Sequence, residues 1–173
     1  MTAYAEQYGI SKLRGIIPAA ASGILSVKNG LETVRGLYKE DDVVIFQEAT
    51  RPMVSVDMIS KLLHSCFEKK SANICRDMKD YVQFIYNDGK STYIDRNSLV
   101  NLESPEAYHY GFITSIFDEA ERQGHLLNES CVAMLLFNLG YDINFIESSV
   151  NNIKIIRQED VAIATVLIKA SIN

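Results

Sequence analysis

A carboxylate and a guanidinium stand three residues apart after a short apolar run. Glu48 and Arg51 follow the β-branched segment Val43–Phe46 in the order Gln-Glu-Ala-Thr-Arg-Pro. Because ligands bind beyond the carboxyl ends of strands in α/β sheets, this position suits chemistry on a phosphate. Glu48 could hold a Mg²⁺ ion, and Arg51 could bind phosphate oxygens through its forked guanidinium. The alternative is an ion pair between the two side chains that only ends the strand.

Two further polar side chains stand out from apolar or small neighbours. Ser26 follows a run of small residues that leads into a helical segment, which makes an anion site physically possible. The GxxxxGK[ST] spacing of a P-loop is absent there. Lys154 alternates with Ile153 and Ile155, so one charged side chain emerges from an apolar run. An edge-strand lysine that reaches solvent is the alternative reading of Lys154.

Short β-branched runs alternate with helical candidates along the chain. We expect strands at Arg14–Pro18, Val43–Phe46, Ala72–Cys75, Ile143–Glu147 and Asn152–Ile156. We expect helices at Leu25–Tyr38, Val56–Lys69, Pro105–Gln123, Glu129–Leu139 and Gln158–Ala170. Near-continuous apolar runs fit parallel strands that are covered on both faces. The alternation therefore predicts an α/β layer fold with right-handed crossovers.

Residues 80–94 break this rhythm. They read DYVQFIYNDGKSTYI, and Asp-Gly between two β-rich runs is a strong hairpin signal. Apolar side chains fall on both faces of this ribbon, and a two-stranded ribbon is marginal alone, so it needs cover on both sides. The hairpin either folds back onto its own domain or forms an arm that packs on a second subunit. An arm would favour an oligomer.

Composition narrows the classes of function. The 173 residues, 47% hydrophobic and 23% charged, predict a single globular domain over 1–173 with 80–94 as a β-arm. A net charge of −5 argues against a nucleic-acid binder. No apolar run approaches the roughly 18 residues that cross a bilayer, and the N-terminus does not resemble a signal peptide. Three widely spaced cysteines favour a reducing cytoplasm without a Cys or His metal site.

Four sequence blocks carry a resemblance to one family. They are SVKNGL at Ser26–Leu31, VVIFQEATRPMVS at Val43–Ser55, IDRNSLVNLESPEAY at Ile94–Tyr108 and NIKIIRQEDVAIA at Asn152–Ala164. In this order and spacing they resemble the cytidylyltransferases that make CDP-methylerythritol from 2-C-methyl-D-erythritol 4-phosphate, with their close relatives that act on ribitol 5-phosphate. The resemblance covers about residues 13–168.

The resemblance implies a fold and an activity. The fold would be a doubly wound, mostly parallel sheet of the nucleotide-diphospho-sugar transferase type, with 80–94 as the extended arm of a homodimer. The activity would be transfer of CMP from CTP to a sugar-alcohol phosphate, with Mg²⁺ and release of pyrophosphate. The acceptor phosphate would attack the α-phosphorus directly, so catalysis would consist of positioning and charge neutralisation.

The resemblance also implies roles for single residues at the nucleotide. Arg51 matches the arginine of the family's "AARP" block, and Lys154 matches the lysine of its "NIK" block, close to the phosphates. These two are the expected catalytic residues. Ser26 matches the serine that approaches the nucleotide. Glu48 stands where the family has an aspartate near the metal and the nucleotide.

On the acceptor side, Arg96 matches an arm arginine that reaches the sugar phosphate in the neighbouring subunit's site. Ser104 keeps a hydroxyl in place of the threonine of the family's "TPQ" block. Other positions depart from the family. Nothing here matches its first strand and its glycine-rich loop, whose arginine and lysine wrap the CTP triphosphate. The family's histidine-aspartate pair is here Gln47-Glu48, and its "TD" pair aligns with Ser130-Cys131, which loses the acid.

These departures motivate two further expectations. The family's first strand lies beside the strand equivalent to Val43–Phe46, so we expect Arg14–Ile17 or a second chain to cover that edge; a third possibility is that the sequence is a fragment of a longer gene product. The alternative function is a catalytically inactive homologue or fragment that acts as a dimeric binding or interaction module.

Overall fold

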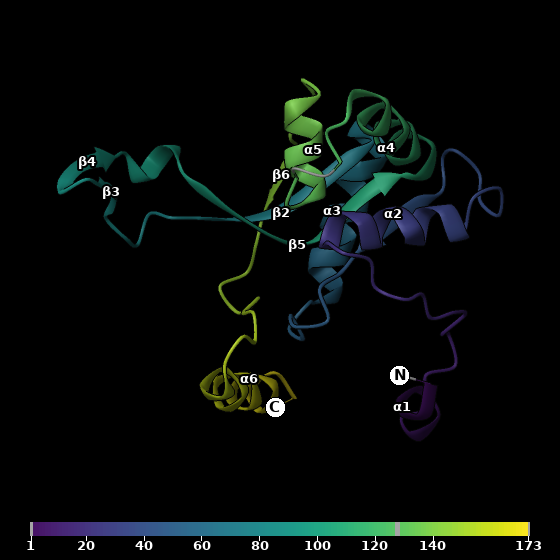
Figure 1. Cartoon of the computed structure of the whole chain (residues 1–173). Helices are drawn as coiled ribbons and strands as arrows, with labels where there is room; N and C mark the ends of the chain where they lie inside the picture. Colours follow the sequence, from purple (N-terminus) through teal and green to yellow (C-terminus); the bar gives the residue numbers. More distant parts are fainter. Residues whose placement is uncertain (1, 127–128, 173) are drawn as a thin grey trace. The chain divides into compact units, whose positions relative to one another are not determined.

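The computed structural model describes residues 2–126 and 129–172 (Figure 1). The chain divides into two compact units. The first comprises the residues up to Lys39 together with Thr114–Tyr141, and the second comprises Glu40–Ile113 together with the residues from Asp142 onward. The single domain expected over 1–173 stays a prediction.

The second unit is built on a mixed sheet, which has four strands among the described residues in the order β1-β5-β2-β6. The strands are β1 (Val43–Phe46), β2 (Ser71–Asp77), β5 (Val100–His109) and β6 (Phe145–Glu147). β5 runs antiparallel to both β1 and β2, whereas β2 and β6 are parallel. Three strands therefore share one direction and only β5 is reversed. The predicted α/β fold on a mostly parallel sheet is confirmed.

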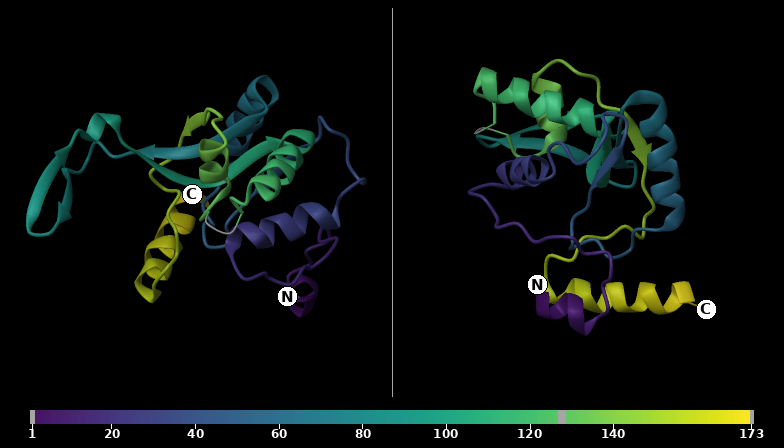
Figure 2. Two further views of the ribbon diagram at one scale, coloured as in Figure 1. Left: turned by 45° about the horizontal axis from the view of Figure 1, so that its top comes forward. Right: turned by 90° about the vertical axis from the view of Figure 1, so that its right-hand side faces the viewer.

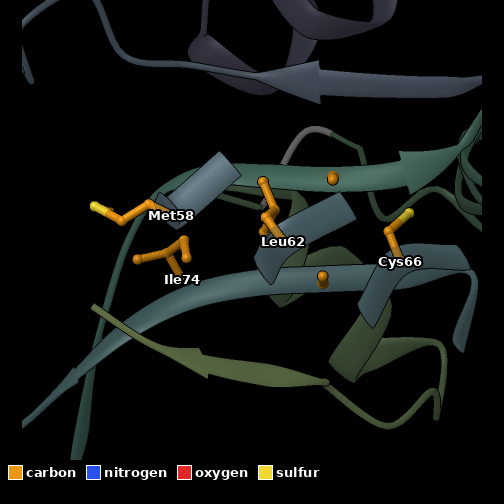
Figure 3. Close-up of a cluster of buried hydrophobic side chains, with 6 residues drawn as sticks. Met58, Leu62, Cys66 and Ile74 are labelled. Carbon is orange, nitrogen blue, oxygen red and sulfur yellow. The ribbon is translucent and has the colours of Figure 1, made fainter. Parts of the chain in front are cut away.

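The helix α3 (Val56–Lys69) packs against this sheet (Figure 2). It begins where the sequence predicts it, because the Ser55 side chain accepts a hydrogen bond from the Met58 backbone N–H. Its apolar side chains recur every four residues and so share one face. Figure 3 shows Met58, Leu62 and Cys66 of this face beside Ile74 of β2. This cluster anchors the strands that carry the candidate site.

β5 contains a bulge in the middle of the sheet. Asn73 pairs with Glu106 and Cys75 pairs with Leu102, so the three residues Glu103–Pro105 stand opposite Ile74 alone. A bulge re-aims side chains and often lies next to a functional site. This strand corrects the expected helix Pro105–Gln123. Its first five residues belong to β5, in which Glu106–His109 pair with β1 and Glu106–Tyr108 with β2, and α4 (Tyr110–Gln123) starts only afterwards.

The predicted hairpin is confirmed. β3 (Gln83–Asn87) pairs with β4 (Lys90–Ile94), and the two linking residues, Asp88 and Gly89, have φ of 50° and 74°. Positive φ at both central positions matches the twist of hairpin strands. Most of its large apolar side chains are more than half exposed, namely Tyr81, Val82, Phe84, Ile85, Tyr86 and Tyr93. The described residues therefore leave most of the ribbon's apolar side chains uncovered, and its role as a β-arm stays a prediction.

The first unit contains α1 (Thr2–Gln7), α2 (Gly23–Thr33) and α5 (Val132–Asn138), with most of α4. Two ion pairs tie α2 and the residues after it to α4: Lys28 to Glu121 at 2.5 Å and Arg35 to Asp118 at 2.8 Å. Against the expected Leu25–Tyr38, α2 starts two residues earlier and ends at Thr33, and against the expected Glu129–Leu139, α5 is shorter at both ends.

Two expected strands are wrong. Arg14–Pro18 forms no strand and its side chains are exposed, so it does not pair with β1, whose strand partner among the described residues is β5. Asn152–Ile156 is irregular and leads into α6 (Gln158–Ile172). The Asp160 carboxylate accepts the backbone N–H groups of Ile156 and Arg157 and so starts that helix. No helix of the described ranges is long and apolar enough to cross a membrane.

Candidate functional site

The turn after β1 is held by hydrogen bonds among its own residues and by one hydrogen bond to the bulge of β5. The Gln47 side-chain amide donates to the carbonyl oxygens of Glu48 and Arg51, at 2.8 and 3.1 Å. The Glu48 backbone N–H donates to Ser104 Oγ at 3.1 Å. The hydroxyl that the sequence analysis singled out therefore holds the turn that carries the candidate acid and cation.

Glu48 lies between the two expected catalytic cations. Arg51 Nε donates to Glu48 Oε2 at 2.9 Å, and Lys154 Nζ donates to Glu48 Oε1. The ion pair that was the alternative reading of Glu48 and Arg51 is therefore formed, and Lys154 extends it into a cluster of three charges. The side chains of Glu48 and Lys154 are each 38% exposed, whereas that of Arg51 is only 8% exposed. A ligand would meet the Glu48–Lys154 pair first.

Arg51 connects this turn to the segment that follows β6. Its Nη1 donates to the Asn152 carbonyl oxygen at 2.7 Å. A second link runs from the Ile155 backbone N–H to the Thr50 carbonyl oxygen at 2.8 Å. These bonds explain why Asn152–Ile156 is not a strand: its polar groups bind the turn instead of a neighbouring strand. The same hydrogen bonds also place Lys154 where its Nζ can donate to Glu48.

A buried carboxylate that the sequence analysis missed lies behind Arg51. Glu103, in the β5 bulge, is fully buried; its Oε2 accepts from Ser148 Oγ at 2.7 Å and from Asn152 Nδ2 at 2.9 Å. The same oxygen lies 3.6 Å from Arg51 Nη1, and Oε1 lies 3.1 Å from Arg76 Nη2. The available signal in the sequence was a charged residue directly before Ser104 in the block that carries the family resemblance.

Local electrostatics move the pKa values of two acids. Partial burial alone would raise the pKa of Glu48, but the hydrogen bonds from Lys154 and Arg51 outweigh it and hold that pKa below its usual range. Burial raises the pKa of Glu106 to about 7, against the hydrogen bond to Tyr108 and with a further rise from the Glu48 charge. Glu48 is therefore charged at neutral pH, and Glu106 titrates near it.

Tyr108 connects Glu106 to the interior of the sheet. Its hydroxyl oxygen lies 2.7 Å from Glu106 Oε2 and 2.7 Å from Asn73 Oδ1. One phenol proton serves only one acceptor at a time, so the Tyr108 hydroxyl donates either to Glu106 or to Asn73.

The other predicted residues lie outside this cluster. Ser26 belongs to the first unit, where its hydroxyl donates to the Ser22 carbonyl oxygen and accepts from the Ala20 backbone N–H. Arg96 opens the short 3-10 helix η1 (Arg96–Ser98) after β4; it is exposed, and its side chain makes no hydrogen bond or ion pair with the described residues. The structure thus brings together Glu48, Arg51, Ser104 and Lys154.

For a metal ion, Glu48 is the available ligand. Across residues 2–126 and 129–172, no three Asp, Glu, His or Cys side chains gather as a possible metal cluster. A site with one carboxylate suits a cation that receives its remaining ligands from water and a bound phosphate.

Comparison with solved structures places this geometry in a known fold. A crystal structure of 4-diphosphocytidyl-2C-methyl-D-erythritol synthase matches with a TM-score of 0.80 at 17% identity, over 96% of this chain and 75% of that chain. The 2-C-methyl-D-erythritol 4-phosphate cytidylyltransferase of Thermus thermophilus matches with a TM-score of 0.75 at 18% identity, over 92% of this chain and 79% of that chain.

Sequence comparison agrees. The chain is 29% identical over 164 residues to 2-C-methyl-D-erythritol 4-phosphate cytidylyltransferase of Geobacter metallireducens, which covers 95% of this chain and 70% of that relative. It is 28% identical over 166 residues to ribitol-5-phosphate cytidylyltransferase of Lacticaseibacillus paracasei, with 94% and 70% covered. The family model described as IspD, 2-C-methyl-D-erythritol 4-phosphate cytidylyltransferase, matches residues 16–170. With nearly its whole length matched in this way, the chain belongs to the 2-C-methyl-D-erythritol 4-phosphate cytidylyltransferase family.

Proposed function

We propose that this protein transfers a cytidylyl group from CTP to a sugar-alcohol phosphate, either methylerythritol phosphate or ribitol phosphate, and releases pyrophosphate. The observation that carries the proposal is the cluster of Glu48, Arg51 and Lys154 at the end of β1, in a chain of this family. The cluster joins charged groups that the sequence holds more than 100 residues apart.

The chemistry needs positioning and positive charge. An oxygen of the acceptor phosphate forms a bond to the α-phosphorus of CTP, and the bond from that phosphorus to the bridging oxygen breaks, so pyrophosphate leaves with the electron pair. Lys154 is the exposed cation that binds the phosphates, in exchange for its bond to Glu48. Arg51 keeps Nε and Nη1 on protein partners, so Nη2 is the donor that we assign to a phosphate.

Mg²⁺ fits this site through Glu48. Its carboxylate is partly exposed and charged at neutral pH, and Mg²⁺ is commonly held by one or two carboxylates together with substrate phosphates. Glu48 would hold the ion with the nucleotide, and the ion would neutralise phosphate charge. When Glu48 holds the ion, Lys154 would lose its hydrogen bond to Glu48 and could bind a phosphate.

The remaining site residues belong to substrate binding. We assign Ser26 to the nucleotide, and Arg96 and Ser104 to the acceptor phosphate, with Arg96 serving the site of a partner subunit. This assignment is supported by the exposed, uncommitted side chain of Arg96 after β4 and by the exposed apolar ribbon beside it. It requires a homodimer joined through the arm. We place the protein in the cytoplasm, where CTP is available.

The test is a transfer assay. The purified chain is incubated with CTP, MgCl₂ and either acceptor, and phosphorus NMR follows pyrophosphate and the CDP-alcohol. Lys154→Ala should lower the rate at least about 100-fold. Lys61→Ala, which removes an exposed lysine paired with Asp57 in α3, is the matched control and should keep the rate. No product with either acceptor from the folded wild-type protein would contradict the proposal.

One observation favours a second candidate. Arg51 is almost fully buried and both cations are paired with Glu48, while the arm exposes large apolar side chains. A catalytically inactive homologue or fragment that acts as a dimeric binding module would have these features. It predicts a dimer and no transfer in the same assay.

A further inference from the structure

We propose that Glu103 is a positioning residue that orients both Arg51 and the Lys154 segment for phosphate binding. This inference rests on the proposed function, because it assigns a role to a side chain behind the same site. Glu103 itself is fully buried and cannot touch a substrate. It acts through the residues that it holds.

Glu103 contacts side chains from several segments of the chain. Its Oε2 receives hydrogen bonds from Ser148 and Asn152 and faces the Arg51 guanidinium, and its Oε1 faces Arg76. A buried carboxylate that loses such partners destabilises the fold. The free-energy cost of leaving its charge unpaired therefore restrains these partners near it. Four side chains from β2, the turn after β1 and the segment after β6 thus converge on one group.

Asn152 links Glu103 to both cations, Arg51 and Lys154. Its side-chain amide donates to Glu103 Oε2 and to the Ser104 carbonyl oxygen, at 2.9 and 3.0 Å. Its own carbonyl oxygen accepts from Arg51 Nη1. Lys154 lies two residues further along and reaches Glu48. A shift of Asn152 would therefore displace Arg51 and Lys154 together.

The bulge of β5 is what brings the carboxylate there. Three residues, Glu103–Pro105, stand opposite one residue of β2, so the bulge frees Glu103 and Ser104 from regular pairing. Ser104 then binds the turn after β1, and Glu103 binds the segment after β6. The bulge of β5 therefore holds both the turn after β1 and the segment after β6.

Glu103→Gln separates positioning from simple charge. If Glu103 only neutralised the site, removing its negative charge would strengthen the binding of a phosphate anion. If it positions Arg51, the substitution weakens binding, because a glutamine amide offers one acceptor oxygen and turns its NH₂ group towards an arginine or towards the donors of Ser148 and Asn152. The two roles predict opposite signs.

The experiment measures CTP affinity by calorimetry in excess MgCl₂, with thermal unfolding as a check that each variant folds. Glu103→Gln should weaken CTP binding about 10- to 100-fold. Ser148→Ala, which removes one donor to Glu103, should weaken it less and in the same direction. Asp118→Asn removes a carboxylate from the Arg35 pair in the first unit and should change nothing. Unchanged or tighter binding by folded Glu103→Gln would overturn the proposal.

A second readout does not depend on activity. The guanidinium N–H signals of Arg51 in nitrogen NMR, assigned by their loss in Arg51→Lys, report how firmly the side chain is held. They should be sharp in the wild type and in Asp118→Asn and broadened in Glu103→Gln. If the wild type neither binds CTP nor transfers CMP, the proposed function fails. Unchanged Arg51 signals in Glu103→Gln would instead overturn the positioning role itself.

Discussion

Arg51 and Asn152 lie 101 residues apart in the sequence, and a 2.7 Å hydrogen bond joins the Arg51 Nη1 to the Asn152 carbonyl oxygen. This bond closes the candidate site, because it fastens the turn after β1 to the segment that carries Lys154. Loop-closure entropy opposes such a long-range contact, so the contact needs support from elsewhere. Glu103 and Ser104 of β5 supply that support from a third segment.

Removal of Arg51 should therefore cost stability as well as binding. In Arg51→Ala, the buried Glu103 loses one of its two cationic neighbours among the described residues and keeps Arg76, and the Asn152 carbonyl oxygen loses its donor. We expect the free energy of unfolding to fall by about 3 kcal/mol, since breaking a buried ion pair leaves a charge uncompensated. Urea denaturation measures the change.

Arg35→Ala is the matched control for this loss. Arg35 also pairs with two carboxylates, Glu32 and Asp118, but all three side chains are nearly half exposed. Exposed pairs contribute little. If both arginine variants lost stability equally, the role given to burial at Arg51 would be wrong.

The sequence predicts the elements that are specified locally. α3 begins and ends where the sequence places it, because Ser55 caps its start and its apolar residues follow helical spacing. The hairpin is equally local, since Asp88 and Gly89 determine the turn. Glu48 and Arg51 were found because they follow an apolar run, and Lys154 because it alternates with isoleucines, each within a recognisable block. In the structure both cations contact Glu48, whereas the roles of the three residues stay predictions.

Errors arose where distant pairing decides the structure. The sequence predicts a helix start at Pro105–His109, but Glu106–Tyr108 pair with strands on both sides. Asn152–Ile156 has strand-like composition, but hydrogen bonds to Thr50 and Arg51 hold it as an irregular segment. Glu103 was missed for the same reason, because its importance depends on a bulge whose register no local pattern encodes.

Loss of Lys154 should change the titration of Glu48. The hydrogen bond and charge of Lys154 help to hold the pKa of Glu48 below its usual range. In Lys154→Ala this pKa should rise, because burial is then opposed by Arg51 alone. Side-chain carboxyl carbon NMR of Glu48 across an acid titration measures the shift, with Lys61→Ala as the control. An unchanged titration would show that the pair does not persist in solution.

The sign of the accompanying stability change follows from the direction of the pKa. A carboxyl whose pKa is lowered by folding stabilises the protein above its unfolded pKa, and this contribution is lost as the pH falls through the folded pKa. The wild type should therefore keep the contribution of Glu48 to a lower pH than Lys154→Ala does.

Glu106 should act in the opposite direction. Its pKa rises on folding from 4.5 to about 7, chiefly through burial, so the folded state holds a proton that the unfolded state releases. Stability from this group is full below about pH 4.5 and falls as the pH rises towards 7. Glu106→Gln should remove that decline and be about 2–3 kcal/mol more stable than the wild type at pH 8, relative to their difference at pH 4.

Chemical denaturation at both pH values tests this expectation. Tyr108→Phe gives a second test. It removes the hydroxyl that links Glu106 to Asn73, and with it a hydrogen bond that opposes the rise of the Glu106 pKa. The decline in stability should then extend to a higher pH. Parallel pH profiles for the wild type and Glu106→Gln would exclude a raised pKa at this position.

The arm should determine the oligomeric state. Phe84 and Tyr93 pack edge to face on one side of the ribbon, with ring centroids 5.9 Å apart, yet they are 57% and 56% exposed. A two-stranded ribbon with such faces is marginal alone, so a second copy that covers it would lower its free energy. We expect the wild type to be a dimer by light scattering coupled to gel filtration, and Phe84→Ser/Tyr93→Ser to be a monomer. Tyr8→Ser removes an aromatic ring with 69% exposure outside the arm and should leave the dimer intact. Since Arg96 follows this ribbon directly, a monomeric arm variant that still transferred CMP at the wild-type rate would exclude the assignment of Arg96 to a partner's site.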